Sequence, residues 1–137
     1  MEVDEARKLC DRWLPLWTGN RPGELSEAYA DDLFYRDPAV PDGLEGKPAF
    51  LAYLRKLLAR FPDWVWEAES VIPMQGGFVL RWRASIPVGG TTVNETGLDL
   101  VFVERGWITR NEVYFDHAAV LEELRRAGSD GASHERG

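Results

Sequence analysis

Apolar residues in the first part of the chain recur every three or four positions, which is the spacing of an amphipathic helix. One such run covers residues 2–18, and Pro15 within it indicates a kink or an early end. The same pattern predicts a short helix over 24–31 and a longer helix over 47–60. The N-terminal part of the chain is therefore expected to be largely helical.

A short strand and a loop separate the last two of these helices. Residues 33–36 form a brief apolar run that is typical of a strand. Asp37-Pro38 and Pro41-Asp42-Gly43 follow at once, and these combinations favour turns. We therefore expect a loop between this strand and the helix over 47–60.

From residue 64 onward the period of the apolar positions changes to two, as in strands with one buried face. The expected strands cover 64–73, 77–87, 91–104 and 107–115. Gly-Gly and Arg-Gly pairs between them are suited to hairpin turns. Helices followed by a run of hairpins predict an α+β fold with an antiparallel sheet, not a doubly wound sheet.

The end of the chain differs from the rest in composition. A last short helix is expected over 117–126. The segment 128–137 has no large apolar residue, and we expect it to be disordered. The chain therefore reads as one domain over 1–127 followed by a disordered tail, in agreement with a usual domain size of about 100–150 residues.

The alternation within the strands indicates which side chains face the helices. Those expected on the inward face are Trp82, Ala84, Ile86, Trp107, Asn111, Val113 and Phe115. The strand over 91–104 is apolar on both sides, and such a strand is usually covered on both faces. A large bare apolar patch is unusual on a monomer. We therefore expect a homodimer that pairs through the outer face of the sheet.

Asp99 interrupts this strand, since it lies between Leu98 and Leu100. A lone buried charge is very unfavourable, so the carboxyl must be paired, hydrogen-bonded or kept neutral. One interpretation is an ion pair with an arginine such as Arg110. The other is a functional carboxyl in an apolar wall, and the spacing alone leaves both open.

Composition narrows the classes of partner. The 137 residues carry 16 basic and 23 acidic side chains, a net charge of −7. This balance disfavours nucleic acids and anionic membrane surfaces, whose binding depends on Lys and Arg. Hydrophobic residues make up 45% of the chain, which is enough for a packed core. The six tryptophans exceed what a core of this size needs.

Other features of the sequence point to a soluble cytoplasmic protein without a metal or other cofactor. Cys10 is the only cysteine, and there are two histidines, so a disulfide or a metal site is not expected. The first residues are acidic where a signal peptide would be basic and then apolar. No stretch approaches the roughly 18 apolar residues of a membrane span.

Two segments resemble the nuclear transport factor 2-like superfamily. The first is Tyr29-Ala-Asp-Asp-Leu-Phe-Tyr-Arg-Asp-Pro38, followed by Gly43-Leu-Glu-Gly46 before a helix. The second runs from Leu98 through Gly106-Trp-Ile108 to Val113-Tyr-Phe-Asp116. The nearest pattern is that of the steroid Δ-isomerase and SnoaL-like polyketide cyclase branch. This resemblance implies a cone-shaped, curved antiparallel sheet wrapped around three N-terminal helices, with a pocket at the open end.

The resemblance also implies roles for individual residues. Asp37 stands where steroid isomerases carry the general base, and Asp99 stands where an aspartic acid contributes to the oxyanion hole. Trp13 occupies the position of the tyrosine that supplies the other oxyanion donor, and an indole N–H can also donate. Leu54 aligns with a second pocket tyrosine, next to Tyr53.

The expected pocket combines these positions with the inward strand faces. Its walls are expected to be Trp13, Leu54, Trp82, Ala84, Val101, Asn111, Val113 and Phe115. An inward amide at Asn111 either orients a ligand or bonds to a neighbouring acid such as Asp99. Many of the tryptophans that exceed the needs of the core are then expected to line the pocket.

Three functions remain open from the sequence. The first is a cofactor-free acid/base isomerase or cyclase of a small apolar carbonyl compound, with Asp37 as base and Asp99 as oxyanion donor. The second is a binding module in which the same pocket holds an apolar ligand and no reaction follows. The third is a structural or regulatory homodimer.

Overall fold

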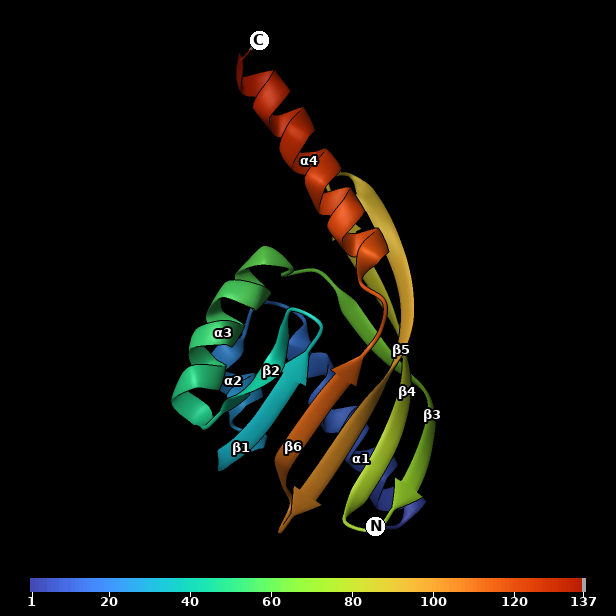
Figure 1. The fold of residues 1–137 in the computed structure, drawn as a ribbon. Helices are drawn as coiled ribbons and strands as arrows, with labels where there is room; N and C mark the ends of the chain where they lie inside the picture. The colour runs from blue at the N-terminus through green and yellow to red at the C-terminus, as the bar shows by residue number, and fades with distance from the viewer. Residues whose placement is uncertain (137) are drawn as a thin grey trace.

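A computed structural model describes residues 1–136 of the chain, with side chains up to Gly128 (Figure 1). The helices are α1 (Val3–Trp13), the 3-10 helix η1 (Leu14–Trp17), α2 (Pro22–Ser26), α3 (Lys47–Arg60) and α4 (Ala118–Arg136). The strands are β1 (Tyr29–Asp37), β2 (Val40–Glu45), β3 (Val65–Met74), β4 (Gly77–Val88), β5 (Thr91–Glu104) and β6 (Trp107–Tyr114). The predicted α+β fold is confirmed, and α1 ends just before Pro15 as expected.

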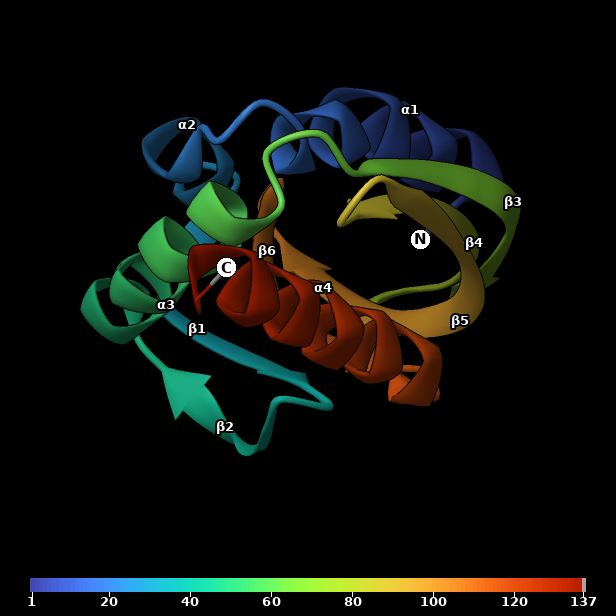
Figure 2. The same ribbon diagram turned by 90° about the horizontal axis from the view of Figure 1, so that it is seen from above.

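The six strands form one open, curved sheet in the order β2-β1-β6-β5-β4-β3. Figure 2 shows the sheet bending around the N-terminal helices, which lie inside its curve. Four of the five strand pairs are antiparallel, but β1 and β6 are parallel. The purely antiparallel sheet that the resemblance implied therefore needs this one correction. A parallel pair is possible because the chain passes through β2, α3 and three further strands before β6 lies beside β1.

The segment after α2 departs from the sequence prediction. Helix α2 ends at Ser26, and β1 begins at Tyr29, so the strand takes over residues that were expected to be helical. Residues 40–45 form β2 where a loop was expected. Pro41 is tolerated there because β2 is an edge strand and needs no complete set of ladder hydrogen bonds.

One predicted strand face is wrong at its beginning. Trp107 is 50% exposed, whereas its neighbour Ile108 is 1% exposed. The register between β5 and β6 shifts where Phe102 pairs with Arg110 and Val103 pairs with Ile108, which leaves Thr109 as an extra residue. Such a bulge reverses the side-chain alternation. Trp107 therefore lies half in solvent, while the later inward positions of β6 keep their predicted side.

The outer face of the sheet carries exposed apolar side chains. On β5, Leu98 is exposed and Leu100 and Phe102 are half-buried, and Tyr114 on β6 lies opposite Leu98. The structure holds a single chain, so the homodimer through this face stays a prediction.

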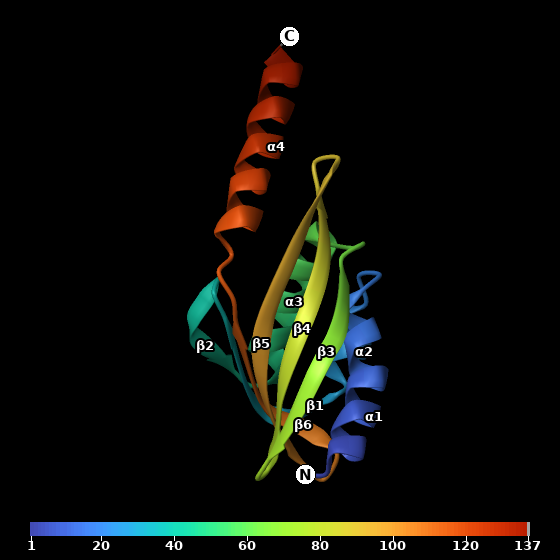
Figure 3. The same ribbon diagram turned by 90° about the vertical axis from the view of Figure 1, so that its right-hand side faces the viewer.

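Helix α4 extends beyond the body of the molecule at the end opposite the N-terminus, beside the β4–β5 hairpin (Figures 1 and 3). It is longer than the helix predicted over 117–126. Ala127 packs so closely on Gly89 that a Cβ there would lie 2.7 Å from it. Side chains after Gly128 and all of Gly137 lie outside the described residues, so the predicted disorder of 128–137 stays a prediction. No helix within residues 1–136 is long and apolar enough to cross a membrane.

Candidate functional site

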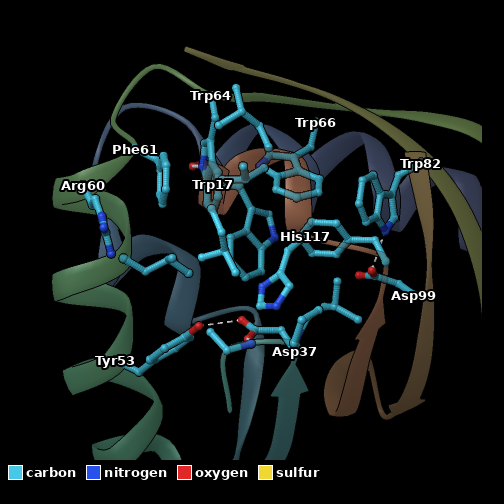
Figure 4. A pocket seen from close by; sticks show the side chains of 18 of the residues that line it. Trp17, Asp37, Tyr53, Arg60, Phe61, Trp64, Trp66, Trp82, Asp99 and His117 are labelled. Carbon is cyan, nitrogen blue, oxygen red and sulfur yellow. Dashed lines mark hydrogen bonds between the residues drawn. The ribbon is translucent and has the colours of Figure 1, made fainter. Parts of the chain in front are cut away.

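A largely apolar cavity lies between the helices and the inner face of the sheet (Figure 4), and side chains of α4 form part of its lining. Its volume is about 140 Å³. An engineered protein cavity of about 150 Å³ binds benzene, so this cavity fits a single ring. Val120, Leu121 and Leu124 of α4 form one side of its wall. Leu121 is also half exposed, so α4 stands at the border between the cavity and the solvent.

Aromatic side chains form a continuous row around this cavity. We call this row the aromatic belt; it consists of Tyr53, Tyr35, Trp17, Trp64, Trp66, Trp82, Phe115 and His117. Neighbouring ring centroids lie 4.5–6.4 Å apart, within the range in which aromatic pairs attract each other. Most of these pairs meet edge to face or tilted, so the belt is a packed wall with a small number of polar groups.

Asp37 ends β1 and is held by four hydrogen-bond donors. The hydroxyls of Tyr35 and Tyr53 donate to Oδ2 over 2.7 and 2.6 Å. The backbone N–H groups of Ala39 and Val40 donate to Oδ1 over 2.8 and 3.2 Å. Burial and the neighbouring carboxylate raise the pKa of both tyrosines, so their hydroxyls keep their protons. The four lone-pair positions of the carboxylate are therefore all used.

Asp99 is equally buried but has fewer partners. The indole Nε1 of Trp82 donates to its Oδ1 over 2.8 Å, and Nδ2 of Asn111 donates to its Oδ2 over 3.1 Å. Burial raises the pKa of Asp99 to about 7, against the lowering effect of these two hydrogen bonds. The charge of Asp37 raises the pKa further. Asp99 is therefore poised to exchange a proton near neutral pH.

The structure does not contain the ion pair between Asp99 and Arg110 that the sequence left open. Arg110 pairs with Glu112 on the outer side of the sheet, with Nε 2.9 Å from Oε2. Among the described residues no salt bridge involves Asp99. Asp99 instead faces the cavity, with neutral donors as its partners.

Close packing over Gly97 holds the Trp82 donor in place. Gly97 lies opposite Trp82 in the β4–β5 ladder. A Cβ at this glycine would lie 2.4 Å from Cζ2 of the indole and 2.7 Å from the carbonyl oxygen of Tyr114. No side chain fits there unless the indole or the backbone moves.

We expect Gly97→Ala to lower the free energy of unfolding by about 2 kcal/mol, because overpacking in a core commonly has this effect. Displacing the indole should also weaken its bond to Asp99. Urea unfolding measures the loss. Gly23→Ala is the control, since a Cβ there meets nothing within 4 Å, and it should leave the stability unchanged or slightly raised. Equal stabilities of the two variants would contradict this packing argument.

The cavity brings together half of the site residues expected from the sequence. Asp37, Asp99, Trp82, Val113 and Phe115 line it. The other five, Trp13, Leu54, Ala84, Val101 and Asn111, lie behind the wall and are at most 1% exposed. Trp13 donates its indole N–H to the hydroxyl of Tyr29 over 3.2 Å. In this structure its N–H does not face the cavity as a second oxyanion donor.

Sequence reasoning missed several wall residues. Tyr35 lies two positions before Asp37 on β1 and therefore on the same face of the strand, so the alternation could have predicted its place in the wall. Trp64, directly before β3, and Trp66 in β3 share one side, but their partners could not be assigned from spacing. His117 points into the cavity from the segment between β6 and α4 (Figure 4). Its ring packs against Phe115, and its imidazole forms no hydrogen bond within the described part of the chain.

The polar groups of the cavity are suited to proton transfer and hydrogen bonding. In residues 1–128 there is no cluster of three or more His, Cys, Asp and Glu side chains that could hold a metal ion. The two carboxyls differ in their surroundings, since one is saturated with donors and the other is not. Carboxyls in unlike environments are a common arrangement for acid/base work.

Comparison with known proteins identifies the fold family. Residues 10–111 match the family model of the SnoaL-like domain. No curated protein sequence is significantly similar to the chain.

Solved structures with similar folds come from several bacteria. A protein with a ketosteroid isomerase-like fold from Catenulispora acidiphila DSM 44928, in complex with trimethylamine, has a TM-score of 0.75 at 18% identity, covering 85% of this chain and 91% of its own. A Bacillus subtilis protein assigned as an isomerase has a TM-score of 0.77 at 16% identity, covering 90% and 96%. An LEH-like epoxide hydrolase from M. tuberculosis has a TM-score of 0.72 at 18% identity, covering 97% and 98%.

At these identities the similarity shows the fold, and one fold supports many reactions. The family match, by contrast, spans most of the chain, from α1 into β6. It agrees with the curved sheet, the enclosed helices and the cavity at the open end of the cone. The chain therefore belongs to the SnoaL-like domain family, within the nuclear transport factor 2-like superfamily that its motifs indicated.

Proposed function

We propose that the protein binds a small apolar carbonyl compound in the aromatic cavity and moves a proton on it without a cofactor, as an isomerase or cyclase. One observation carries the proposal. Asp99 faces the cavity, and both of its partners are groups that can only donate to it. A protonated Asp99 can therefore donate its proton only to a group in the cavity, such as a bound ligand.

The hydrogen-bond chemistry of the partners supports this step. An indole nitrogen is a donor and never an acceptor, and the amide nitrogen of Asn111 also only donates. With a pKa raised to about 7, Asp99 is partly protonated near neutral pH. A buried O–H without an acceptor is unfavourable. A carbonyl oxygen of the ligand removes that penalty, and the bond strengthens as the oxygen gains negative charge.

In the proposed reaction Asp37 is the base. Its carboxylate takes a proton from the carbon next to the carbonyl group, and the electron pair of that C–H bond moves toward the carbonyl oxygen. Asp99 donates a hydrogen bond to the resulting enolate, and Asp37 then returns the proton to another carbon. To accept the proton, Asp37 must release one of its four donors, and Tyr53 is the less buried of the two tyrosines.

The size of the cavity limits the substrate. About 140 Å³ suits one ring, so the proposed substrate is a monocyclic or similarly small compound. A larger ligand requires the side chains of α4 at the mouth to move.

A second candidate is binding without chemistry. The observation in its favour is that all four lone-pair positions of Asp37 are used, which leaves no free position for an incoming proton. The aromatic belt would still hold an apolar or cationic ligand, because the faces of Trp and Tyr attract cations. The relative from Catenulispora acidiphila that binds trimethylamine makes a small amine a reasonable probe for this alternative.

The test combines binding and turnover. Tryptophan fluorescence should be quenched by cyclohex-3-enone, and ultraviolet absorbance should report its conversion to the conjugated isomer. We expect Asp37→Asn and Asp99→Asn each to reduce turnover by about 10²–10⁴-fold, the usual contribution of a positioned acid or base. Asp32→Asn, an exposed change on the same strand, is the control and should keep full turnover. Quenching by cyclohex-3-enone or trimethylamine without any turnover would favour the binding module instead.

A further inference from the structure

A buried hydrogen-bond chain runs behind the cavity wall from α1 to β5. Nε1 of Trp13 donates to the hydroxyl of Tyr29 over 3.2 Å, and this hydroxyl donates to Oδ1 of Asn111 over 2.8 Å. Nδ2 of Asn111 then donates to Oδ2 of Asp99 over 3.1 Å. The first three residues are at most 1% exposed, and Asp99 is 5% exposed. The chain thus connects a carboxyl in the cavity with three side chains that do not line it.

The direction of this chain follows from its first member. Because the indole of Trp13 can only donate, the oxygen of Tyr29 must accept its proton. The single hydroxyl proton of Tyr29 is then free to be donated onward, and it goes to the amide oxygen of Asn111. An amide group has its oxygen on one side and its nitrogen on the other. With the oxygen turned to Tyr29, the nitrogen is the atom that faces Asp99.

We propose that Trp13 and Tyr29 are positioning residues, which fix the orientation of the Asn111 amide so that the carboxyl beside it can give its proton only to a ligand. This inference rests on the proposed function for its purpose, since an acid that must donate into the cavity is what an enolate needs. The geometry itself does not depend on any substrate.

The alternative orientation shows why the direction matters. If the amide of Asn111 turned over, its oxygen would face Asp99 and accept the proton of the neutral carboxyl. The neutral form of Asp99 would then be stabilised inside the protein, and its proton would point away from the cavity. Asp99 would then no longer donate its proton to the ligand. Its pKa would also rise, because a hydrogen bond to the neutral form favours that form.

The other ionisable groups near Asp99 are few. Burial and the charge of Asp99 both raise the pKa values of Tyr29 on β1 and Cys10 on α1, that of Cys10 to about 12. Neither of them ionises near neutral pH. Asp37 acts on Asp99 from the end of β1 and raises its pKa. His117 faces the same cavity from the segment before α4, so the titration must be observed on Asp99 itself.

The test is a titration of the ¹³C-labelled side-chain carboxyl of Asp99 in the free protein, assigned by its absence from Asp99→Asn. Tyr29→Phe removes the hydroxyl that holds the amide oxygen, and Trp13→Phe removes the donor that sets the direction. In both variants we expect the midpoint of Asp99 to rise by about one unit, the effect of gaining one hydrogen bond to the neutral form.

Trp64→Phe is the matched control. Trp64 is also a buried indole, and it donates to the backbone carbonyl of Trp17 over 2.6 Å, outside the chain that ends at Asp99. The control should keep the wild-type midpoint even though it loses a comparable contact. A general loosening of the core would shift the control as well.

Wild-type midpoints in both Tyr29→Phe and Trp13→Phe would overturn the inference. If Trp13→Phe does not fold, Tyr29→Phe, which keeps the buried ring, decides alone. Because no substrate is present, the outcome is independent of turnover. A shifted midpoint of Asp99 together with no reaction of any carbonyl compound would contradict the proposed function but support the positioning role.

Discussion

The free energy of unfolding should fall as the pH is raised from 4 to 8, and Asp99→Asn should remove most of that fall. The side chain is buried, and its pKa is raised from 3.8 to about 7 in the folded protein. Between these two values the folded state holds a proton on Asp99 that the unfolded state has released. Unfolding therefore releases a proton, and stability decreases as the pH increases.

The sign and the window follow from the two pKa values. Below about pH 4 both states are protonated, and the stability that Asp99 contributes is fully present. It is lost progressively as the pH rises through 7, where the folded state must bury a charge. The total loss is about 4 kcal/mol, since each pKa unit corresponds to about 1.4 kcal/mol. Few other single groups in a domain of this size have such an effect.

Urea unfolding at several pH values between 4 and 8 measures this dependence. Asp99→Asn cannot ionise in this range, so any constant change that the amide brings leaves its slope unaffected. The comparison therefore uses the slope alone. Asp32→Asn, an exposed aspartate on β1, should retain the wild-type slope. Parallel slopes for wild type and Asp99→Asn would mean that Asp99 is already ionised at pH 4, and the oxyanion-donor role would then be untenable.

The second large effect is expected at Asp37. We expect Asp37→Ala to lower the free energy of unfolding by about 3 kcal/mol, because hydrogen bonds to a charged group are among the strong ones and their donors are left buried. Two of these donors are backbone N–H groups of the turn after β1, which cannot turn elsewhere. The other two are the hydroxyls of Tyr35 and Tyr53, from β1 and from α3.

Three variants make this measurement specific. Asp32→Ala removes a carboxylate of the same strand that is exposed, and it should change the stability by less than about 0.5 kcal/mol. Tyr35→Phe and Tyr53→Phe each remove one donor and should each have a smaller effect than Asp37→Ala. If Asp37→Ala unfolds at the same urea concentration as Asp32→Ala, then Asp37 does not anchor the turn and the two walls of the cavity.

Most helices and strands could be predicted from the sequence because their patterns are local. The strands β3 to β6 begin and end within one residue of the expected positions. The alternation along β4 is unbroken from Leu80 to Val88, so its inward face was also predictable. The failures lie at the start of β1, which was expected to be helical, at β2, where Pro41 and Gly43 in a paired edge strand resemble a loop, and at Trp107, where a bulge shifts the alternation. Helix α4 is also longer than expected.

The candidate site was partly predictable for a different reason. Asp37 and Asp99 could be found because one lies in a recognisable motif and the other interrupts an apolar strand. Much of the rest of the wall could not, since Trp17, Trp64 and Tyr53 come from three separate segments, and their meeting depends on how α3 and the sheet curve around the same space. Side-chain spacing within a segment carries no information on that curvature.

By itself the sequence determined the class of fold, the inward faces of most strands and the presence of two unusual carboxyls. The fold class and the strand faces follow from the periodicity of apolar residues, and the two carboxyls stand out from the residues next to them in the chain. Both kinds of evidence are local in the sequence. Only the tertiary structure decided that four donors saturate Asp37 whereas Asp99 has only two, and that Trp13 donates to Tyr29 instead of facing the cavity. Tyr53 beside Asp37 and the partners of Asp99 and Trp13 lie far apart in the chain and meet only once the sheet has curved around the helices, so no local pattern encodes these contacts.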